Sequence, residues 1–390
     1  VGSEMCIRDR IETGRSLLVV PNMSFQEAIQ YRTELHKLAE LSGQEIKTAQ
    51  YIQNKLEEMG FNVRSGVGGH GLVVDIDSGV AGPMVMLRAD IDALPYADPN
   101  DPERIEAIHA CGHDAHAAIL LAAAPEIRKN LKKGKVRLAF QPAEESLQGA
   151  LAMIKDGVLD GVDIVVGSHI RPVQDLPFGK YCASVNHVAC ATVEVRIDGK
   201  QAHAARPHLG INPIEAASQY IASVGLIKID PNKSWSVKPT QIHSEVGATN
   251  SIPSFVKIAY DLRAQDNAAL EAIIGRMKLA AAGLEGSFGA KASCEVTEYC
   301  PGPEYDEALG ELFKETVAGT FGKETLGTNC GGGGEDFHFY KKAKSELRVL
   351  YYGIGSGAAP GLHDRNMNFN EAILPQASQL LVNVVGKILA

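Results

Sequence analysis

The sequence predicts an α/β fold, in which a domain with a mixed, largely parallel sheet is interrupted by an inserted ferredoxin-like α+β domain. Short strand-like runs alternate with helix-like segments over the first half of the chain, which is typical of a parallel sheet. The pattern changes between residues 188 and 298, where strands and helices follow a βαββαβ order. The length of 390 residues also suits two domains, since single hydrophobic cores stop growing at about 250–300 residues.

The first half of the chain supplies most elements of the larger domain. Residues 24–60 are predicted to form one long helical region that ends at Gly60, a suitable C-terminal glycine. Three β-rich pieces follow, "FNVRS", "GLVVDID" and "PMVMLRAD". After a histidine-rich loop, helices and strands alternate in "AAILLAAAPEIRKNL", "KVRLAF", "GALAMIKDGVL" and "VDIVVGS". This alternation indicates parallel strands that are joined by helices.

The inserted domain begins with "ATVEVRIDG", whose alternating pattern is that of a half-exposed strand. The next helix starts after Asn212, an N-cap residue that precedes Pro213 and the capping-box residue Glu215. The order is completed by "TQIHSEVGA", "SFVKIAYDLRA", "NAALEAIIGRMKLAAAGL" and "KASCEVTEY". The chain then returns to a helix, the strand "RVLYYGIG" and a closing helix. We therefore assign residues 23–187 and 299–390 to the larger domain and 188–298 to the inserted one.

The composition disfavours several kinds of partner. The net charge of −9 and the absence of a long basic run argue against nucleic acid and membrane surfaces. No apolar run reaches the roughly 18–20 residues of a membrane span. Seven widely spaced cysteines, an odd number, favour a reduced, cytoplasmic protein over a disulfide scaffold. Because "VGSEMCIRDR" has no apolar period, we expect residues 1–22 to be a non-native extension before Met23. The one low-complexity stretch is "GGGG" at 331–334.

Metal-capable side chains follow four predicted strands of the larger domain. Open α/β sheets build their sites at the carboxyl ends of the strands, so these groups are expected to meet at one edge. They are Cys111 with His113, Glu144 with Glu145, His169 and His363. Taken singly, each has an ordinary structural interpretation, such as a buried core histidine or a solvated pair of acids. Their shared position at strand ends weakens that interpretation for the whole set.

A cysteine, several histidines and a glutamate suit zinc, manganese, cobalt or nickel better than calcium or magnesium. The segment "CGHDAH" opens a helix, whose N-terminal dipole favours a thiolate at Cys111. Hydrolysis at such a centre needs a general base beside the attacking water. One of Glu144 and Glu145 would bind metal and the other would act as the base, and the spacing leaves both assignments open.

Eight motifs run in order through the chain: "RADIDALP", "HACGHDAH", "FQPAEES", "SHIRP", "GKQAHAARPHLGINP", "NSIPSF", "GGEDF" and "LHDRNMNFNE". Together they resemble the metal-dependent aminoacylase/carboxypeptidase-type amidohydrolases, in the branch of hippurate hydrolases, N-acyl-amino-acid deacylases and auxin–amino-acid conjugate hydrolases. The resemblance covers Ser24 to Ala390. It implies that the larger domain is a catalytic domain and that the inserted domain is a lid domain that also mediates dimerisation.

The resemblance implies two divalent metal ions per subunit, with manganese or zinc favoured and cobalt or nickel as alternatives. It implies Glu144 as the base that activates water and then protonates the leaving amine. The implied metal ligands are Cys111, His113, Glu145, His169 and His363. The residues implied to orient these ligands are Asp92, His109, Asp114 and His116. Glu335 and Asp336 are expected to line the pocket.

Three lid residues acquire roles only through the resemblance. In similar enzymes the histidine that matches His203 reaches the partner subunit's site and stabilises the oxyanion. Asn250 and Arg263 match positions that hold the substrate carboxylate, a task that suits the arginine fork. Without the resemblance, Arg263 would be interpreted as part of a strand-surface salt bridge. The segment "ADPNDPERIEAI" departs from the family pattern near the mouth of the site, which leaves the acyl-group preference open.

The expected function is that of a cytoplasmic, homodimeric, metal-dependent amidohydrolase that cleaves N-acyl amino acids into a carboxylate and a free amino acid. Within the family, the alternatives are an aminobenzoyl-glutamate hydrolase and a small dipeptidase, which panels of acyl amino acids and dipeptides would separate. Outside the family, the alternative is a non-catalytic protein that binds carboxylates or metals. The complete ligand set beside Glu144 argues against that alternative.

Overall fold

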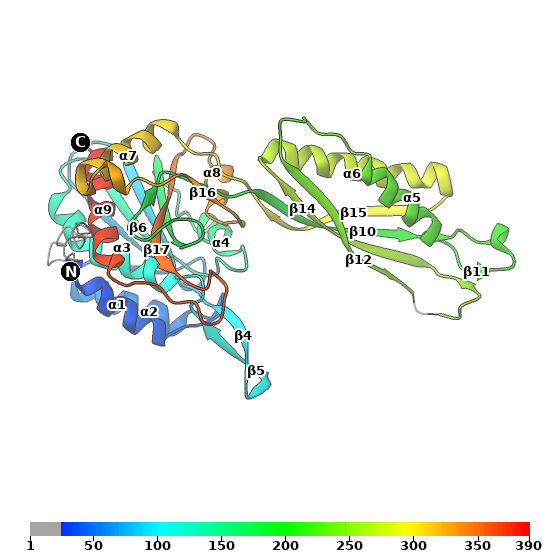
Figure 1. Cartoon of the computed structure of the whole chain (residues 1–390), viewed down its shortest axis with the longest axis horizontal. Helices are drawn as coiled ribbons and strands as arrows, with labels where there is room; N and C mark the ends of the chain where they lie inside the picture. The colour runs from blue at the N-terminus through cyan, green and yellow to red at the C-terminus, as the bar shows by residue number, and fades with distance from the viewer. Residues whose placement is uncertain (1–24, 246) are drawn as a thin grey trace, which may run out of the picture.

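The computed structural model describes residues 25–245 and 247–390, so the expected extension over residues 1–22 lies outside the described residues. Two sheets with separate hydrophobic cores make up the fold (Figure 1). A seven-stranded sheet belongs to the larger domain and a four-stranded sheet belongs to the inserted domain. The two domains are called below by the names that the resemblance implies, the catalytic domain and the lid domain. The predicted α/β class with a mixed, largely parallel central sheet is confirmed.

The central sheet of the catalytic domain carries its parallel strands in the middle. In spatial order its strands are β1 (Arg64–Val67), β2 (Gly71–Asp77), β6 (Lys135–Gln141), β3 (Met84–Asp90), β7 (Ile164–Pro172), β17 (Arg348–Ala358) and β8 (Tyr181–Cys182). The strands β6, β3, β7 and β17 run parallel, whereas β1, β2 and β8 pair antiparallel with their neighbours. Every residue of β3 is buried, as expected of a strand that is covered on both faces. The carboxyl ends of the parallel strands therefore meet at one edge.

Helices cover both faces of this sheet (Figure 1). One face packs against α1 (Glu27–Lys37), α2 (Ile46–Glu58), α3 (His113–Asn130), α7 (Glu307–Phe321) and α9 (Ile373–Ile388). The other face packs against α4 (Gly149–Lys155) and α8 (His338–Ala343). Across the described residues, no helix combines the length and the apolarity that a bilayer crossing requires.

The helical region predicted over residues 24–60 ends at Gly60 as expected, with a positive φ of 77°, but a break divides it into two helices, α1 and α2. Gly43, within the break, takes a positive φ of 77°. The fully buried Glu45 accepts hydrogen bonds through Oε1 from the backbone N–H groups of Gly43 and Ala143, both at 2.8 Å. An acid in a helix-like run thus makes a long-range contact, which local periodicity does not reveal.

The lid domain has the expected βαββαβ order. Its elements are β10 (Ala189–Asp198), α5 (Pro213–Gly225), β12 (Trp235–Ser244), β14 (Phe255–Ala264), α6 (Asn267–Phe288) and β15 (Lys291–Cys300). The sheet order is β12-β14-β10-β15 with antiparallel pairs throughout. Alternate residues of β10 are buried in the core with α5 and α6, and those between them are half-exposed on the open face of the sheet. The Asn212 side chain accepts a hydrogen bond from the Ile214 N–H at 3.0 Å, which confirms the predicted N-cap.

Short elements complete the fold. At the end of the lid farthest from the catalytic domain, β11 (Ala202–His203) pairs with β13 (Ser251–Ile252), close to the 3-10 helix η2 (Pro207–Leu209) (Figure 1). In the catalytic domain, β9 (Val185–Asn186) pairs with β16 (Cys330–Gly331), and η3 (Lys323–Thr325) follows α7.

The segment that departs from the family pattern forms a projecting hairpin of β4 (Leu94–Asp98) and β5 (Asp101–Ile108), which the sequence analysis did not anticipate (Figure 1). The Tyr96 hydroxyl donates a hydrogen bond to the carbonyl of His363 at 2.8 Å. Arg365 pairs with Glu106 on the other strand. The hairpin thus braces the loop that carries one of the predicted metal ligands.

A buried ion pair fastens α1 to the start of α3. The Asp114 carboxylate is fully buried and lies 3.0 Å from Arg32 Nε. The substitution Asp114→Asn leaves the buried Arg32 guanidinium with the partly exposed Glu371 as its remaining anionic partner. We therefore expect the free energy of unfolding, measured by urea denaturation, to fall by about 3 kcal/mol.

The matched control is Asp77→Asn, which breaks an exposed pair with Lys135 at 2.8 Å. Solvent screens this pair, so the denaturation midpoint should stay almost unchanged. Equal losses of stability in the two variants would contradict the assignment of a structural ion pair at Asp114.

Candidate metal centre

The loop before α3 places two predicted ligands at the carboxyl edge of the sheet. Gly112 has a φ of 86°, a left-handed conformation that favours glycine. A Cβ atom at this position would lie 2.3 Å from Ile170 Cδ1, so the Ile170 side chain would have to shift to admit it. The turn directs the donor atoms of Cys111 and His113 into the same space, within 4.8 Å of each other.

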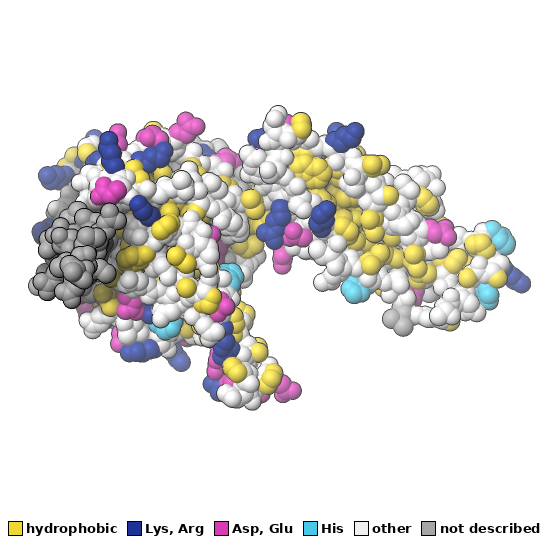
Figure 2. Space-filling model, in the orientation of Figure 1, with side chains coloured by type: hydrophobic (Ala, Val, Ile, Leu, Met, Phe, Trp, Pro, Cys, Tyr) yellow, Lys and Arg dark blue, Asp and Glu magenta, His cyan; other side chains and the backbone are white. Residues whose placement is uncertain are grey.

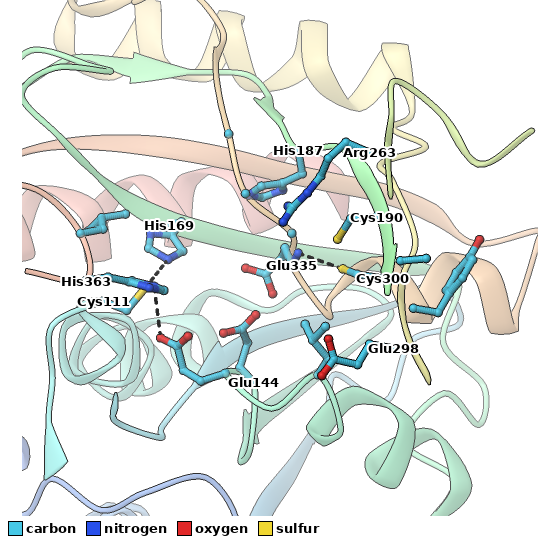
Figure 3. A pocket seen from close by; sticks show the side chains of 18 of the residues that line it. Cys111, Glu144, His169, His187, Cys190, Arg263, Glu298, Cys300, Glu335 and His363 are labelled. Carbon is cyan, nitrogen blue, oxygen red and sulfur yellow. Dashed lines mark hydrogen bonds and ion pairs between the residues drawn. The ribbon is translucent and has the colours of Figure 1, made fainter. Parts of the chain in front are cut away.

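The five predicted ligands come from four separate segments and lie close together (Figure 3). Cys111 Sγ is 3.3 Å from His169 Nε2. Glu145 Oε1 is 3.7 Å from His113 Nε2 and 3.6 Å from His363 Nε2. The donor atoms form two groups, each within 4.8 Å: Cys111, His113 and His169 in one, and Cys111, Glu145 and His363 in the other. A thiolate common to both groups suits two neighbouring cations.

The donor set also fits metal ions because two of its atoms are buried without another partner. Among the described residues, His113 Nε2 and Glu145 Oε1 make no hydrogen bond. Leaving a buried polar atom unpaired costs about 1–3 kcal/mol, so a ligand is expected to satisfy both. Sulfur, imidazole and carboxylate together match zinc or manganese better than calcium.

Asp92 orients two members of the cluster. Its Oδ1 is 2.9 Å from His113 Nδ1, which leaves Nε2 of that ring facing the other donors. Its Oδ2 accepts hydrogen bonds from the Glu145 backbone N–H at 3.0 Å and from the Ser42 hydroxyl at 2.7 Å. A carboxylate behind a ligating histidine fixes the orientation and tautomer of the ring. Asp92 therefore lies where the sequence analysis expects an orienting residue.

His116 supports the cluster through Asp90, a residue that the sequence analysis did not single out. His116 Nδ1 is 2.6 Å from Asp90 Oδ1, and its Nε2 accepts a hydrogen bond from the Ile170 N–H at 3.0 Å. The ring packs edge-on against His169, with centroids 4.5 Å apart. Asp90 precedes Asp92 by two residues, and residues two apart in an extended chain point to the same face. This spacing at the end of β3 is the sequence signal that identifies Asp90.

The remaining two residues of the expected orienting set lie behind the loop. Asp114 pairs with Arg32 and with His36, whose Nδ1 is 2.8 Å away, so its carboxylate anchors α3 to α1. His109 is buried, and within the described residues neither of its ring nitrogens has a hydrogen-bond partner. His109 therefore makes no hydrogen bond through which it could orient a predicted metal ligand.

Backbone strain is concentrated at this centre. Ala143 and Leu147, on either side of the glutamate pair, have φ values of 54° and 57°, and His363 has a φ of 64°. These three are the non-glycine residues with positive φ in the described parts of the chain. Such conformations cost about 1–3 kcal/mol each and tend to cluster at functional sites. Glu45 helps to hold the strained Ala143 through the hydrogen bond from its N–H.

Glu144 lies beside the donor cluster as a candidate base. Its Oε2 is 3.8 Å from His113 Nε2. Burial, together with the negative charges of Glu335 and Asp336, raises the pKa of the Glu144 carboxyl well above its usual range. A carboxylate with a raised pKa is a stronger base, which suits proton transfer near neutral pH. Burial likewise raises the pKa of Glu145 to about 7.

Arg88 holds the two acids next to Glu144. Its Nη2 is 3.0 Å from Glu335 Oε1 and 2.8 Å from Asp336 Oδ1. The Asp336 N–H donates a hydrogen bond to Glu144 Oε1 at 3.4 Å. Glu335 lines the adjacent cavity as expected, whereas Asp336 is fully buried behind it. The sequence analysis did not identify Arg88, because an arginine inside a strand gives no local indication of its partners.

A cavity of about 540 Å³ connects the donor cluster to the root of the lid (Figure 3). Cys111, Glu144 and His363 belong to its catalytic wall. Arg263 belongs to its lid wall, and Figure 3 shows the guanidinium pointing into the cavity. Arg263 Nη2 is paired with Asp261 at 3.0 Å. The structure thus brings Arg263, but not the other two predicted lid residues, to the same cavity as the cluster.

His203 and Asn250 lie together at the far end of the lid, in and beside the β11–β13 pair (Figure 1). Both are exposed. The Ala204 N–H donates a hydrogen bond to the Asn250 carbonyl at 2.8 Å, so the two segments are joined at this point. Neither residue reaches the cavity of its own chain.

Comparison with known proteins connects this geometry to a family. The family model of peptidase family M20/M25/M40 matches residues 86–387. The chain belongs to this family. It is 35% identical to the N-acetyl-L-cysteine deacetylase of Bacillus subtilis, over 93% of this chain and 88% of that protein. An IAA-amino acid hydrolase of Arabidopsis thaliana is 29% identical, over 94% of this chain and 87% of that protein.

A solved structure extends the match to the fold of the whole chain. A dinuclear metal binding peptidase of the M20 family from Bacillus subtilis aligns with a TM-score of 0.78 and 28% identity, over 94% of this chain and 98% of that one. The resemblance to the aminoacylase-type amidohydrolases is thereby confirmed. This M20 protein is a metal-dependent enzyme that hydrolyses amide bonds.

Proposed function

We propose that this M20 enzyme hydrolyses the N-acyl amide bond of N-acyl amino acids and releases a carboxylate and a free amino acid. The observation that carries the proposal is one cavity with the donor cluster and Glu144 on one wall and Arg263 on the other. This arrangement suits a substrate whose amide lies at the donor cluster and whose carboxylate contacts the Arg263 guanidinium.

The proposed metal ligands are Cys111, His113, Glu145, His169 and His363, holding two divalent ions, with manganese or zinc favoured over cobalt or nickel. When bound, such ions polarise the scissile carbonyl and lower the pKa of water. Glu144 accepts the proton of the attacking water and passes it to the leaving amine. Its buried position beside Glu335 and Asp336 raises the pKa of its carboxyl, which favours the first of these transfers.

Arg263 binds the carboxylate of the amino-acid part through its fork of N–H donors. His203 and Asn250 complete the site only if they come from a second subunit, because both lie at the far end of their own lid. We therefore propose a homodimer in which His203 of the partner subunit donates a hydrogen bond to the developing oxyanion. Asn250 of the partner subunit would contact the substrate carboxylate.

The names of the relatives support the amino-acid half of the substrate. One relative is named for N-acetyl-L-cysteine and another for IAA-amino acids. The two named substrates differ in their acyl groups, and both contain an amino acid. The β4–β5 hairpin, which departs from the family pattern, braces the His363 loop beside the cavity. The substrate library below therefore varies the acyl group.

The test is hydrolysis of a mixed library of N-acetyl, N-benzoyl and longer N-acyl amino acids together with dipeptides, followed by mass spectrometry. The enzyme is loaded with manganese or zinc, and a chelated sample is the control. Chelator-sensitive loss of acyl amino acids supports the proposal. Preferential loss of dipeptides supports a dipeptidase instead, and no turnover by the loaded protein supports a binding protein.

Metal binding is expected to release protons. Burial and the nearby Glu145 charge raise the pKa of Cys111 well above its usual range, and burial raises that of Glu145 to about 7. Both groups must lose their protons to bind metal, so affinity for manganese should increase as the pH rises through about 7. Isothermal titration in two buffers with different ionisation enthalpies measures this release. Identical binding enthalpies in the two buffers would contradict it.

A further inference from the structure

Two cysteines face each other where the chain passes between the two domains. Cys190 lies near the start of β10 and Cys300 is the last residue of β15, and the two are directly opposed in the antiparallel ladder. Both border the cavity that contains the donor cluster (Figure 3). The proposed hydrolytic chemistry uses neither thiol.

The glycine run singled out in the sequence leaves room for this thiol pair. A Cβ atom at Gly334 would lie 3.1 Å from Cys300 Sγ and 3.2 Å from Cys190 Sγ, so both sulfurs point at the same glycine. Opposed residues of an antiparallel pair have Cα atoms about 4.5–5.5 Å apart. Disulfides span Cα separations of about 4.4–6.8 Å, so the ladder already provides the required spacing.

We propose that Cys190 and Cys300 form a thiol–disulfide exchange site that reacts with low-molecular-weight disulfides entering the cavity, and that the resulting protein disulfide lowers the hydrolytic activity. The Cys190 thiolate attacks one sulfur of the small disulfide, whose S–S bond breaks and releases one thiolate. Cys300 then loses its proton to solvent and attacks the Cys190 sulfur, which releases the second thiolate. The small disulfide is reduced to two thiols while the protein dithiol is oxidised.

The surroundings of Cys190 favour the first attack. The neighbouring Cys300 thiol lowers the pKa of Cys190 to about 7, and the positive charge of Arg263 also lowers it. Cys190 is half-exposed, whereas Cys300 is buried. A partly exposed thiol with a lowered pKa attacks disulfides readily, and a second thiol beside it resolves the mixed disulfide.

A second thiol pair in the fold provides an internal comparison. Cys182 and Cys330 have their sulfurs 3.4 Å apart, closer than many non-bonded contacts, but both are buried and neither is among the residues that line the described cavity. Access to the cavity therefore distinguishes the pair of Cys190 and Cys300 from this second pair.

The position of the bond explains the effect on hydrolysis. A disulfide here would tie together β10 and β15, the two strands through which the lid joins the catalytic domain. The Glu335 N–H also donates a hydrogen bond to Cys300 Sγ at 3.2 Å, and Glu335 lies beside Glu144. Oxidation would thus restrain the lid and disturb the surroundings of the proposed base at the same time.

The experiment treats the full-length, manganese-loaded enzyme with oxidised glutathione and maps disulfides by peptide mass spectrometry. The expected result is a peptide pair linked through Cys190 and Cys300, with a loss of hydrolysis that dithiothreitol restores. In Cys300→Ser, glutathione should stay attached to Cys190, because the resolving thiol is missing. The matched control is Cys294→Ser on the same strand, a half-buried position opposite Val195, which should behave like the parent enzyme.

The exchange site would be overturned if no peptide pair linked through Cys190 and Cys300 is found. It would also be overturned if the only linkage found joins Cys182 to Cys330. A complete cross-link with unchanged hydrolysis would overturn the regulatory effect. That effect depends on the proposed function, whereas the cross-link does not. If no substrate in the library is hydrolysed, the mass map still tests the exchange site independently.

Discussion

Glu144→Gln is expected to lower kcat on N-acyl amino acids by about 10²–10⁴-fold while metal content stays that of the parent enzyme. The amide keeps the size of the side chain and can still accept a hydrogen bond from the Asp336 N–H. It removes the carboxylate that takes up and returns the proton. Steady-state kinetics combined with metal analysis of the same preparation measures both quantities.

The matched variant is the neighbouring Glu145→Gln. Glu145 Oε1 lies between two histidine nitrogens, at 3.7 Å and 3.6 Å, so this change should lower both metal content and activity. If Glu144→Gln keeps activity, and if metal is lost only from that variant, the roles of base and metal ligand would be reversed between Glu144 and Glu145. Such a result would restore the alternative assignment that the spacing of "EES" leaves open.

His203→Ala is expected to lower kcat by about 10²–10³-fold, the usual cost of losing an oxyanion donor. The stronger test mixes it with Glu144→Gln under conditions that exchange subunits. A mixed dimer has one site with both an intact Glu144 and an intact His203 of the partner subunit. Activity should then recover to about a quarter of the parent value, because half of randomly assorted dimers are mixed and each has one intact site.

The control for this experiment is His208→Ala, a nearby exposed histidine in η2 at the same end of the lid. It should leave kcat almost unchanged. No recovery on mixing, from proteins shown to exchange subunits, would mean that His203 does not act across the dimer. A fully active monomer would lead to the same conclusion.

The strands and the ligands at their ends are the parts that the sequence predicts well. Buried parallel strands are recognised by their continuous apolar runs, and the topology then fixes which ends meet. That rule brings Glu145, which follows β6, close to the carboxyl end of β7, where His169 lies within the strand rather than after it. Cys111 reaches the same edge only after the β4–β5 hairpin that follows β3.

Residues that act through long-range contacts are the parts that periodicity misses. Glu45 occurs in a helix-like stretch but caps the backbone of Ala143, which lies 98 positions away. Arg88 and Asp90 occur in an apolar strand, but Arg88 pairs with acids of the centre and Asp90 pairs with His116. The hairpin of β4 and β5 is missed because its mostly exposed, charge-rich second strand lacks the apolar alternation that identifies strands.

The lid shows the same limit at a larger scale. Motif order assigns Asn250 and Arg263 to one substrate group, whereas in a single chain they lie at opposite ends of the lid domain. Motif order contains no information about which copy of the chain supplies a residue. The structure separates the two residues within one chain, and the proposed second subunit would bring them to one substrate.

The insertion of the lid between β7 and β17 also affects how the protein is made. β17 pairs directly with β7, yet it leaves the ribosome only after the whole lid has been synthesised. At about 5–20 residues per second, the delay is about 10–35 s. During that time β7 lacks its neighbour β17, and an apolar edge strand is open to wrong pairing. His363 follows β17 in the chain, so the last of the proposed metal ligands is made only after the lid and β17.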